Sequence, residues 1–248
     1  MTATMQNLYD NIKTLITKYF EEKTIEDETL PQIVESYFNY NQGKLNIDMP
    51  HMELTVTGSS FSTYSSTPFT YTGRVMVDWG DDTGLIEYRG GELYHSYSVS
   101  DTYTVKIYGN ITSLRDFCFY NCIGLTSVII PDSVSSLGYA CFYSCTDLIS
   151  ITLPNSVTSL GNSCFNNCTG LTSITLPDSV TSLGEGCFSR CTRLTNIQLN
   201  WNTTTEIITY NSTWIYEASA NVKFSIPNST TSLYTAKGYP SDKLVESD

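Results

Sequence analysis

The sequence predicts a mostly β fold of the α+β class, in which a short solenoid of repeats is fused to a small β-sandwich and preceded by helices. Three observations predict it. Segments 125–147, 148–170 and 171–193 align without gaps at a period of 23, and the last two share 16 of 23 residues. Such a fixed period is typical of a solenoid. Short runs in which apolar and polar residues alternate precede the repeats, and apolar residues at helical spacing occupy the N-terminus.

Each repeat is expected to contain one short strand followed by irregular or short helical turns. In the third repeat Ile174 and Leu176 face inward and Thr175 faces outward. Pro177 ends the strand because it has no N–H to donate, and Gly184 is expected to allow the next bend. One unit has too few inward residues to close a core, so the units must stack.

The repeat pattern extends beyond these three segments. Residues 102–124 are predicted to form an incoming unit, because seven of their apolar residues lie one period before apolar residues of the next unit: Val105, Ile107, Ile111, Leu114, Cys118, Phe119 and Cys122. Residues 194–199 supply one more strand. The strand–Pro–turn–helix order returns in 222–244, so 102–199 is predicted as the repeat domain and 200–248 as the cap that a solenoid needs.

The repeats resemble the BspA-like leucine-rich repeats, whose units read L-x-x-I-x-L-P-x-S-V-x-x-I-G-x-x-A-F-x-x-C. The resemblance covers about residues 102–199 and departs at the position that usually holds Ala, which is taken by Cys118, Cys141, Cys164 and Cys187. The family occurs in bacterial surface adhesins, in some protists and archaea, and in phage-encoded proteins. The resemblance therefore implies a leucine-rich-repeat solenoid that recognises a protein or a glycan.

All eight cysteines lie in the repeats as C-x-x-x-C pairs. Metal binding and disulfides are the functional interpretations. We favour two columns of buried thiols, because free cysteine is among the most buried side chains. Successive pairs are displaced along the solenoid, so four sulfurs need not converge as in a zinc site. The redox state of the thiols is left open.

Residues 51–107 are predicted to form the sandwich. Val75, Val77 and Trp79 alternate as a strand before a turn at 80–84. The segments V-x-V-D-W-G-D-D-T, H-S-Y and T-Y-T-V-K-I resemble the PKD-type, immunoglobulin-like β-sandwich, a spacer domain of surface proteins. Asp82 replaces the usual Gly, and Asp101-Thr102 replaces the usual Pro-Gly. The last strand of this domain is expected to be also the first strand of the solenoid.

Two features of this region could indicate a metal site or a catalytic residue. Asp78, Asp81 and Asp82 are suitable Ca²⁺ ligands, but a turn stabilised by Asp side chains explains them more simply, and the choice is left open. His95 is predicted to be a structural hydrogen-bonding residue, because no nucleophile or partner acid is recognisable around it in the sequence.

The N-terminal segment 1–50 is predicted to be helical with a linker at its end. Residues 5–22 have apolar side chains at helical spacing, and a second short helix is expected from Pro31 to Phe38. The segment either attaches the protein to an assembly or a sister chain, or packs on its own chain. The attachment or oligomerisation residues would be Leu8, Ile12, Leu15, Ile16, Tyr19 and Phe20.

The composition excludes some function classes. The net charge of -12 and the pI of about 4.5 disfavour nucleic-acid binding. No secretory signal and no membrane span are expected. No cofactor, metal site or catalytic residue is predicted, since the two histidines accompany no recognisable catalytic motif, although a carboxylate-pair hydrolase would leave no local trace.

The favoured hypothesis is a non-enzymatic binding or structural module on a phage or viral particle, in a tail or head fibre, where it contacts a receptor and other virion proteins. The alternatives are a cytoplasmic interaction scaffold and a cell-surface adhesin whose signal was removed. The localisation would be the virion surface or the cytoplasm of the producing cell. A ligand on the strand face would touch the outward residues Ser127, Ile129, Ser150, Thr152, Ser173, Thr175, Asn196 and Gln198.

Overall fold

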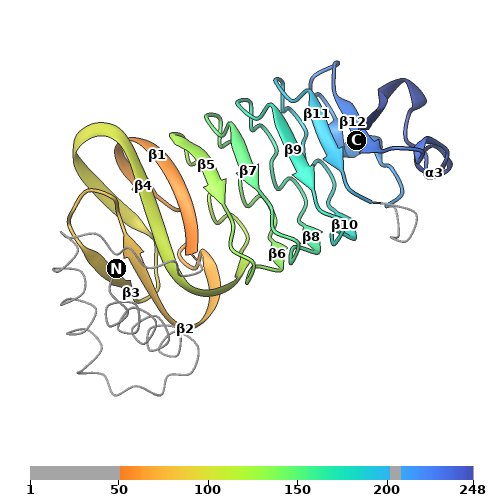
Figure 1. Ribbon diagram of the computed structural model, residues 1–248. Coiled ribbons are helices and arrows are strands. Elements are labelled where there is room, and N and C mark those ends of the chain that lie inside the picture. The colour runs from red at the N-terminus through yellow and green to blue at the C-terminus, as the bar shows by residue number, and fades with distance from the viewer. Residues whose placement is uncertain (1–50, 202–207, 248) are drawn as a thin grey trace, which may run out of the picture.

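The computed structural model describes residues 51–201 and 208–247, which form a stack of short strands with a curved sheet at its N-terminal end (Figure 1). The curved sheet consists of four strands: β1 (His51–Ser62), β2 (Phe69–Asp78), β3 (Leu85–Tyr88) and β4 (Tyr94–Leu114). β4 lies between β1 and β2, antiparallel to both, and β3 pairs with β2. Alternate residues such as Leu54 and Val105, which are register partners, are buried.

The solenoid that follows has two ladders of strands. The first ladder has two hydrogen-bonded parts that lie side by side (Figure 1). One contains β5 (Leu125–Ile129) and β7 (Ser150–Thr152), and the other contains β9 (Ser173–Leu176), β11 (Asn196–Leu199), β12 (Lys223–Pro227) and β13 (Leu244–Ser247). The second ladder contains β6 (Ser136–Leu137), β8 (Ser159–Leu160) and β10 (Ser182–Leu183). Pairs such as Ser127 with Ser150 and Ser173 with Asn196 are one 23-residue period apart and parallel. The sequence period therefore sets the register of the stack.

The junction between sheet and solenoid differs from simple stacking. The end of β4 continues the second ladder, because Leu114 pairs with Leu137 of β6. In the first ladder, however, β1 lies between β4 and β5, and Leu54 occupies the position beside Val128 that the period assigns to Val105. Only the second half of the incoming unit 102–124 thus stacks as a repeat, while β1 supplies the strand next to β5.

The core of the solenoid consists of residue columns. The rings of Phe119, Phe142, Phe165 and Phe188 stack with successive centroid distances of 5.1, 5.2 and 5.6 Å. All four rings are buried. Backbone hydrogen bonds join each turn to the next at these positions, for example from the Phe142 N–H to the Cys164 carbonyl at 2.8 Å. Stacked units therefore bury a core that no single unit could close.

The glycine column has a different role from the one expected. Gly184 was predicted to allow a bend, but its φ lies outside the left-handed region. A Cβ at Gly184 would instead lie 2.3 Å from the backbone nitrogen of Asn162, and one at Gly161 would lie 2.5 Å from the carbonyl carbon of Gly138. Glycine is needed here because adjacent turns approach too closely for any side chain.

The predicted cap, 200–248, adds two strands to the first ladder. β12 pairs in parallel with β11, and β13 pairs with β12. Between them lies the helix α3 (Thr231–Ala236), and the preceding 3-10 helix η1 (Ser212–Ile215) contributes the Trp214 carbonyl that accepts from the Phe188 N–H at 2.7 Å. A second 3-10 helix, η2 (Ser241–Lys243), precedes β13.

The predicted fold class is wrong for the described part of the chain. Residues 51–201 and 208–247 are almost entirely β, with α3 as their one α-helix. The strands β1–β4 do not form two packed sheets, as a sandwich requires, because hydrogen bonds join them into one sheet that continues into both ladders. The predicted N-terminal helices, with Leu8, Ile12, Leu15, Ile16, Tyr19 and Phe20, lie outside the described residues. In the described part no helix is long and apolar enough to cross a membrane.

Candidate functional site

The strand face is the outward surface of the first ladder. Its predicted residues Ser127, Ile129, Ser150, Thr152, Ser173, Thr175, Asn196 and Gln198 are exposed or half-buried, whereas the residues between them are buried. Register places them in two rows, with Ser127 beside Ser150 and Ile129 beside Thr152. Ile129, 48% exposed, is the one large apolar side chain among the eight.

The strand face is longer than the repeats indicate. On the N-terminal side, Thr55 pairs with Ser127 and Glu53 with Ile129, and β4 adds Thr104 and Lys106 beyond them. On the C-terminal side, Lys223 and Ser225 follow Asn196 and Gln198. Sequence reasoning missed the β1 residues because β1 joins the ladder antiparallel and outside the repeat. The alternation in M-E-L-T-V-T is the signal that marks them as a strand.

The chemistry of the strand face is that of hydrogen bonding. The Ser127 hydroxyl donates to Thr55 Oγ1 at 2.8 Å, and the Ser225 hydroxyl donates to Asn196 Oδ1 at 2.7 Å. Lys106 Nζ lies 4.0 Å from Glu53 Oε2 at the N-terminal end. Hydroxyl and amide groups both donate and accept, so the eight predicted residues present an uncharged surface suited to a polar, neutral ligand.

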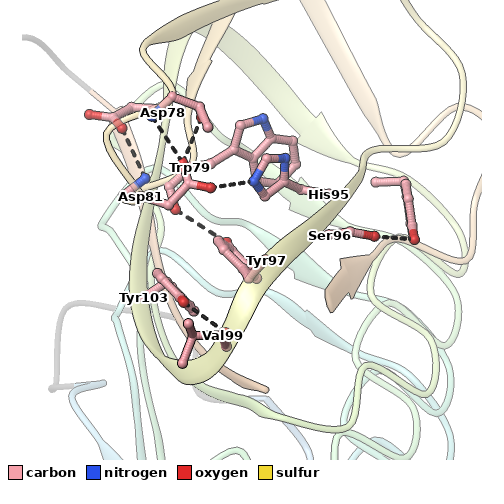
Figure 2. A network of polar contacts seen from close by, with 11 residues as sticks. Asp78, Trp79, Asp81, His95, Ser96, Tyr97, Val99 and Tyr103 are labelled. Carbon is pink, nitrogen blue, oxygen red and sulfur yellow. Dashed lines mark hydrogen bonds and ion pairs between the residues drawn. The ribbon is translucent and has the colours of Figure 1, made fainter. Parts of the chain in front are cut away.

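A second polar cluster surrounds His95 at the edge of the curved sheet (Figure 2). His95 Nε2 lies 2.6 Å from Asp81 Oδ2, and both side chains are 16% exposed. The imidazole ring stacks on Trp79, with centroids 4.6 Å apart and an interplanar angle of 9°. The Tyr97 hydroxyl donates to the Trp79 carbonyl at 3.2 Å. His95 therefore has a partner acid, which the sequence did not reveal.

The turn carboxylates of this cluster bond to their own backbone. Asp78 Oδ1 accepts from the Gly80 N–H at 2.9 Å, and Asp81 Oδ1 accepts from the Thr83 N–H at 3.2 Å. These are the turn-stabilising bonds that were the alternative to Ca²⁺ binding. Asp82 has a φ of 61°, in the left-handed region where the PKD-type pattern has Gly. Within residues 51–201 and 208–247, no three His, Cys, Asp or Glu side chains are grouped to hold a metal ion.

The cysteines form two buried columns, as predicted. All eight are buried thiols. In one column three of the four thiols donate to a backbone carbonyl of the preceding turn, for example Cys145 to Phe119 at 3.0 Å and Cys168 to Phe142 at 3.0 Å. Burial raises the pKa of the Cys191 thiol to about 12. These thiols are structural elements of the stack and are not positioned as nucleophiles.

The comparisons with known proteins identify the repeats. Residues 96–237, more than half of the chain, match the model of the BspA type leucine rich repeat region in six copies. The chain therefore belongs to the BspA-type leucine-rich repeat family. The match starts at residue 96 and describes repeats alone, so it gives no support for a PKD-type domain in front of them. No curated protein sequence matches the chain significantly.

Several solved structures resemble parts of the chain. The pneumococcal vaccine antigen PcpA aligns with a TM-score of 0.43 and 15% identity, over 56% of this chain and 42% of that one. A leucine rich repeat protein of T. pallidum aligns with a TM-score of 0.32 and 20% identity, over 52% of this chain and 78% of that one. A leucine rich cell surface protein of Faecalibacterium prausnitzii aligns with a TM-score of 0.29 and 26% identity, over 49% and 40%. The chain thus spans less than half the length of PcpA.

Proposed function

We propose that this protein is a non-enzymatic binding module that recognises a protein or a glycan through its strand face. One observation carries the proposal: register aligns the outward residues of β5 with those of β7, and of β9 with those of β11, into rows that are mostly small, uncharged hydrogen-bonding groups. Membership of a leucine-rich repeat family supports it, because such solenoids present extended binding surfaces. Small side chains let a partner approach the sheet closely over many repeats.

The test uses two arginine substitutions on the strand face. Thr152 and Thr175 are exposed and one period apart, so Thr152→Arg with Thr175→Arg places two bulky charges on the rows without touching the core. The full chain and the variant are applied to an array of defined glycans and extracellular-matrix proteins. At least one ligand bound by the parent chain should be lost by the variant, with the thermal midpoint unchanged.

The chain offers a matched control. Thr158 and Thr181 are exposed threonines of the same two repeats, also one period apart, and they precede β8 and β10 of the second ladder. Thr158→Arg with Thr181→Arg adds the same charge in another place and should leave binding intact. If both double variants bind equally well, the ligand does not occupy the strand face.

Display on a phage or viral particle, in a tail or head fibre, remains a prediction. Its support is the occurrence of this repeat type among phage-encoded proteins. Mass spectrometry of purified particles from the producing cells tests it, and particles without this chain would contradict it.

Homo-oligomer formation through residues 1–50 is tested by light scattering of the full chain and of a version lacking them. A mass that falls to that of the monomer on truncation would support the N-terminal segment as the oligomerisation element.

A further inference from the structure

A patch of aromatic side chains lies on the surface where the curved sheet meets the first repeats. The aromatic patch consists of Tyr64, Phe117, Tyr120, Tyr139 and Tyr143. Tyr64 and Tyr139 are 67% and 46% exposed, and the other three are half-buried. The rings contact one another, with centroid distances of 4.9 Å between Tyr64 and Tyr120, 5.0 Å between Tyr120 and Tyr143, and 5.1 Å between Phe117 and Tyr139.

The repeat does not require aromatic residues at these positions. One period after Tyr139 the chain has Asn162, and one period after Tyr143 it has Asn166. The following repeat has Glu185 and Ser189 there. Polar residues therefore satisfy the same backbone geometry, and the rings of the first repeat expose apolar surface that contributes nothing to the core. A contiguous exposed patch of this kind marks an interaction site.

A polar groove of about 510 Å³ borders the aromatic patch. Its lining includes the hydroxyl residues Ser65, Thr67, Ser113 and Ser136, together with Arg115 and Asp116. The groove and the patch are directly connected, because Asp116 Oδ1 accepts a hydrogen bond from the Tyr139 N–H at 2.7 Å. Its volume falls in the range of small-molecule sites, about 300–1,000 Å³.

The two charged residues of the groove remain available to a ligand. Arg115 forms no ion pair within the described part of the chain, and its guanidinium carries five donors in a rigid fork. Asp116 uses Oδ1 for the Tyr139 N–H, and within the described residues Oδ2 has no hydrogen-bond partner. The charges of Arg115 and Asp116 offset each other, so the groove favours a neutral ligand with hydrogen-bonding groups over a charged one.

From this juxtaposition we infer a second binding site, for a neutral oligosaccharide. The C–H groups on one face of a sugar ring carry partial positive charge and pack against the negative face of an aromatic ring. The sugar hydroxyls both donate and accept, and match the serine and threonine hydroxyls, Arg115 and Asp116. A protein partner would need roughly 800 Å² of matching surface, whereas the exposed rings are few and the groove beside them is polar. The inference goes beyond the strand-face proposal and shares no residue with it.

The experiment uses the full chain and a panel of neutral oligosaccharides, namely cello-, laminari-, malto- and chitohexaose. Calorimetry should detect binding of at least one of them. Tyr64→Leu and Tyr139→Leu keep an apolar side chain but remove the ring, and each should weaken binding about threefold to tenfold. Tyr64→Phe keeps the ring and should bind within about twofold of the parent chain. Arg115→Met should weaken binding at least about fivefold.

Two controls separate this site from folding and from the strand face. Tyr216→Leu changes an exposed tyrosine in the C-terminal cap and should leave sugar binding unchanged. The Thr152→Arg with Thr175→Arg variant should also bind the sugar normally, so that failure of the strand-face proposal and failure of this one are distinguishable. Circular dichroism melts verify that each variant is folded.

Four outcomes would overturn the inference. The first is that no panel member binds at millimolar concentration, and the second is that binding survives both leucine substitutions. The third is a doubled mass of the parent chain in light scattering that falls to the monomer mass in Tyr64→Leu, since the patch would then be covered by a second copy. The fourth is protection of Tyr64 and Tyr139 from hydroxyl-radical labelling in the lone chain, which would mean that the chain covers its own patch.

Discussion

Asp81 accepts a hydrogen bond from the imidazole ring of His95 at 2.6 Å, across a sequence separation of 14 residues. Burial raises the pKa of Asp81, but the hydrogen bonds from Thr83 and His95 outweigh burial and leave it below its ordinary value of 3.8. The carboxylate therefore stabilises the fold in its charged form. Because the pKa is lowered on folding, this stabilisation is complete above about pH 4 and is lost as the pH falls through the folded-state value.

Asp81→Asn should remove this pH-dependent contribution. We expect a loss of about 1 kcal/mol in the free energy of unfolding at pH 7, because a hydrogen bond to a charged group is replaced by a neutral one. The difference between the variant and the parent should become smaller between pH 7 and pH 2, as the parent carboxyl takes up a proton. Urea unfolding at both pH values measures this. Asp132→Asn, at an exposed position, is the control, and a loss at pH 7 that persists unchanged at pH 2 would contradict the assignment.

Gly161→Ala should destabilise the solenoid by about 3 kcal/mol, the upper end of the usual cost of overpacking. The added Cβ would meet the backbone of Gly138 and Tyr139 at 2.5–2.6 Å, and backbone cannot move aside as a side chain can. Gly186→Ala is the matched control. Gly186 has a φ of 65°, and the equivalent positions one and two periods earlier hold Ser163 and Ala140 at 55° and 50°. It should cost about 1 kcal/mol, and equal losses in thermal unfolding would refute the close-approach explanation.

Phe165→Ala should cost about 3–5 kcal/mol, the range for a buried phenylalanine whose removal leaves a cavity. The ring lies between Phe142 and Phe188, at 5.2 and 5.6 Å, and is fully buried. Phe165→Leu should recover part of the loss. Tyr143→Ala removes a half-buried ring from the surface stack with Tyr120 and should cost much less. Chemical denaturation of the three variants measures the difference, and similar losses for Phe165→Ala and Tyr143→Ala would contradict the core assignment.

The eight thiols should be unreactive in the folded protein and fully reactive after unfolding. Burial raises the pKa of Cys191 to about 12, so little thiolate is present at pH 8 and access is blocked. Intact-mass measurement after iodoacetamide treatment should show no adduct in buffer and eight adducts in urea without reductant. Fewer than eight adducts in urea would indicate disulfides, and a number that rises with a chelator would indicate a bound metal.

The sequence by itself determined the repeating part of this protein. Ile174 and Leu176 alternate with exposed residues, and Phe142, Phe165 and Phe188 recur one period apart, so each unit packs on a copy of itself in the only register that aligns its apolar columns. The outward positions of the strand face follow from the same alternation. Family membership rests on this periodic signal.

Only the tertiary structure decided the contacts that no period encodes. The insertion of β1 between β4 and β5, the pairing of Asp81 with His95, and the meeting of Tyr64 with Tyr120 all join residues from different local patterns. The alternation of β1 predicts a strand, but it does not say which strand lies beside it. The close approach at Gly161 likewise depends on the spacing between turns. Local sequence preferences specify each strand or turn. Which elements lie next to one another depends on the apolar surface that they bury together in the folded chain.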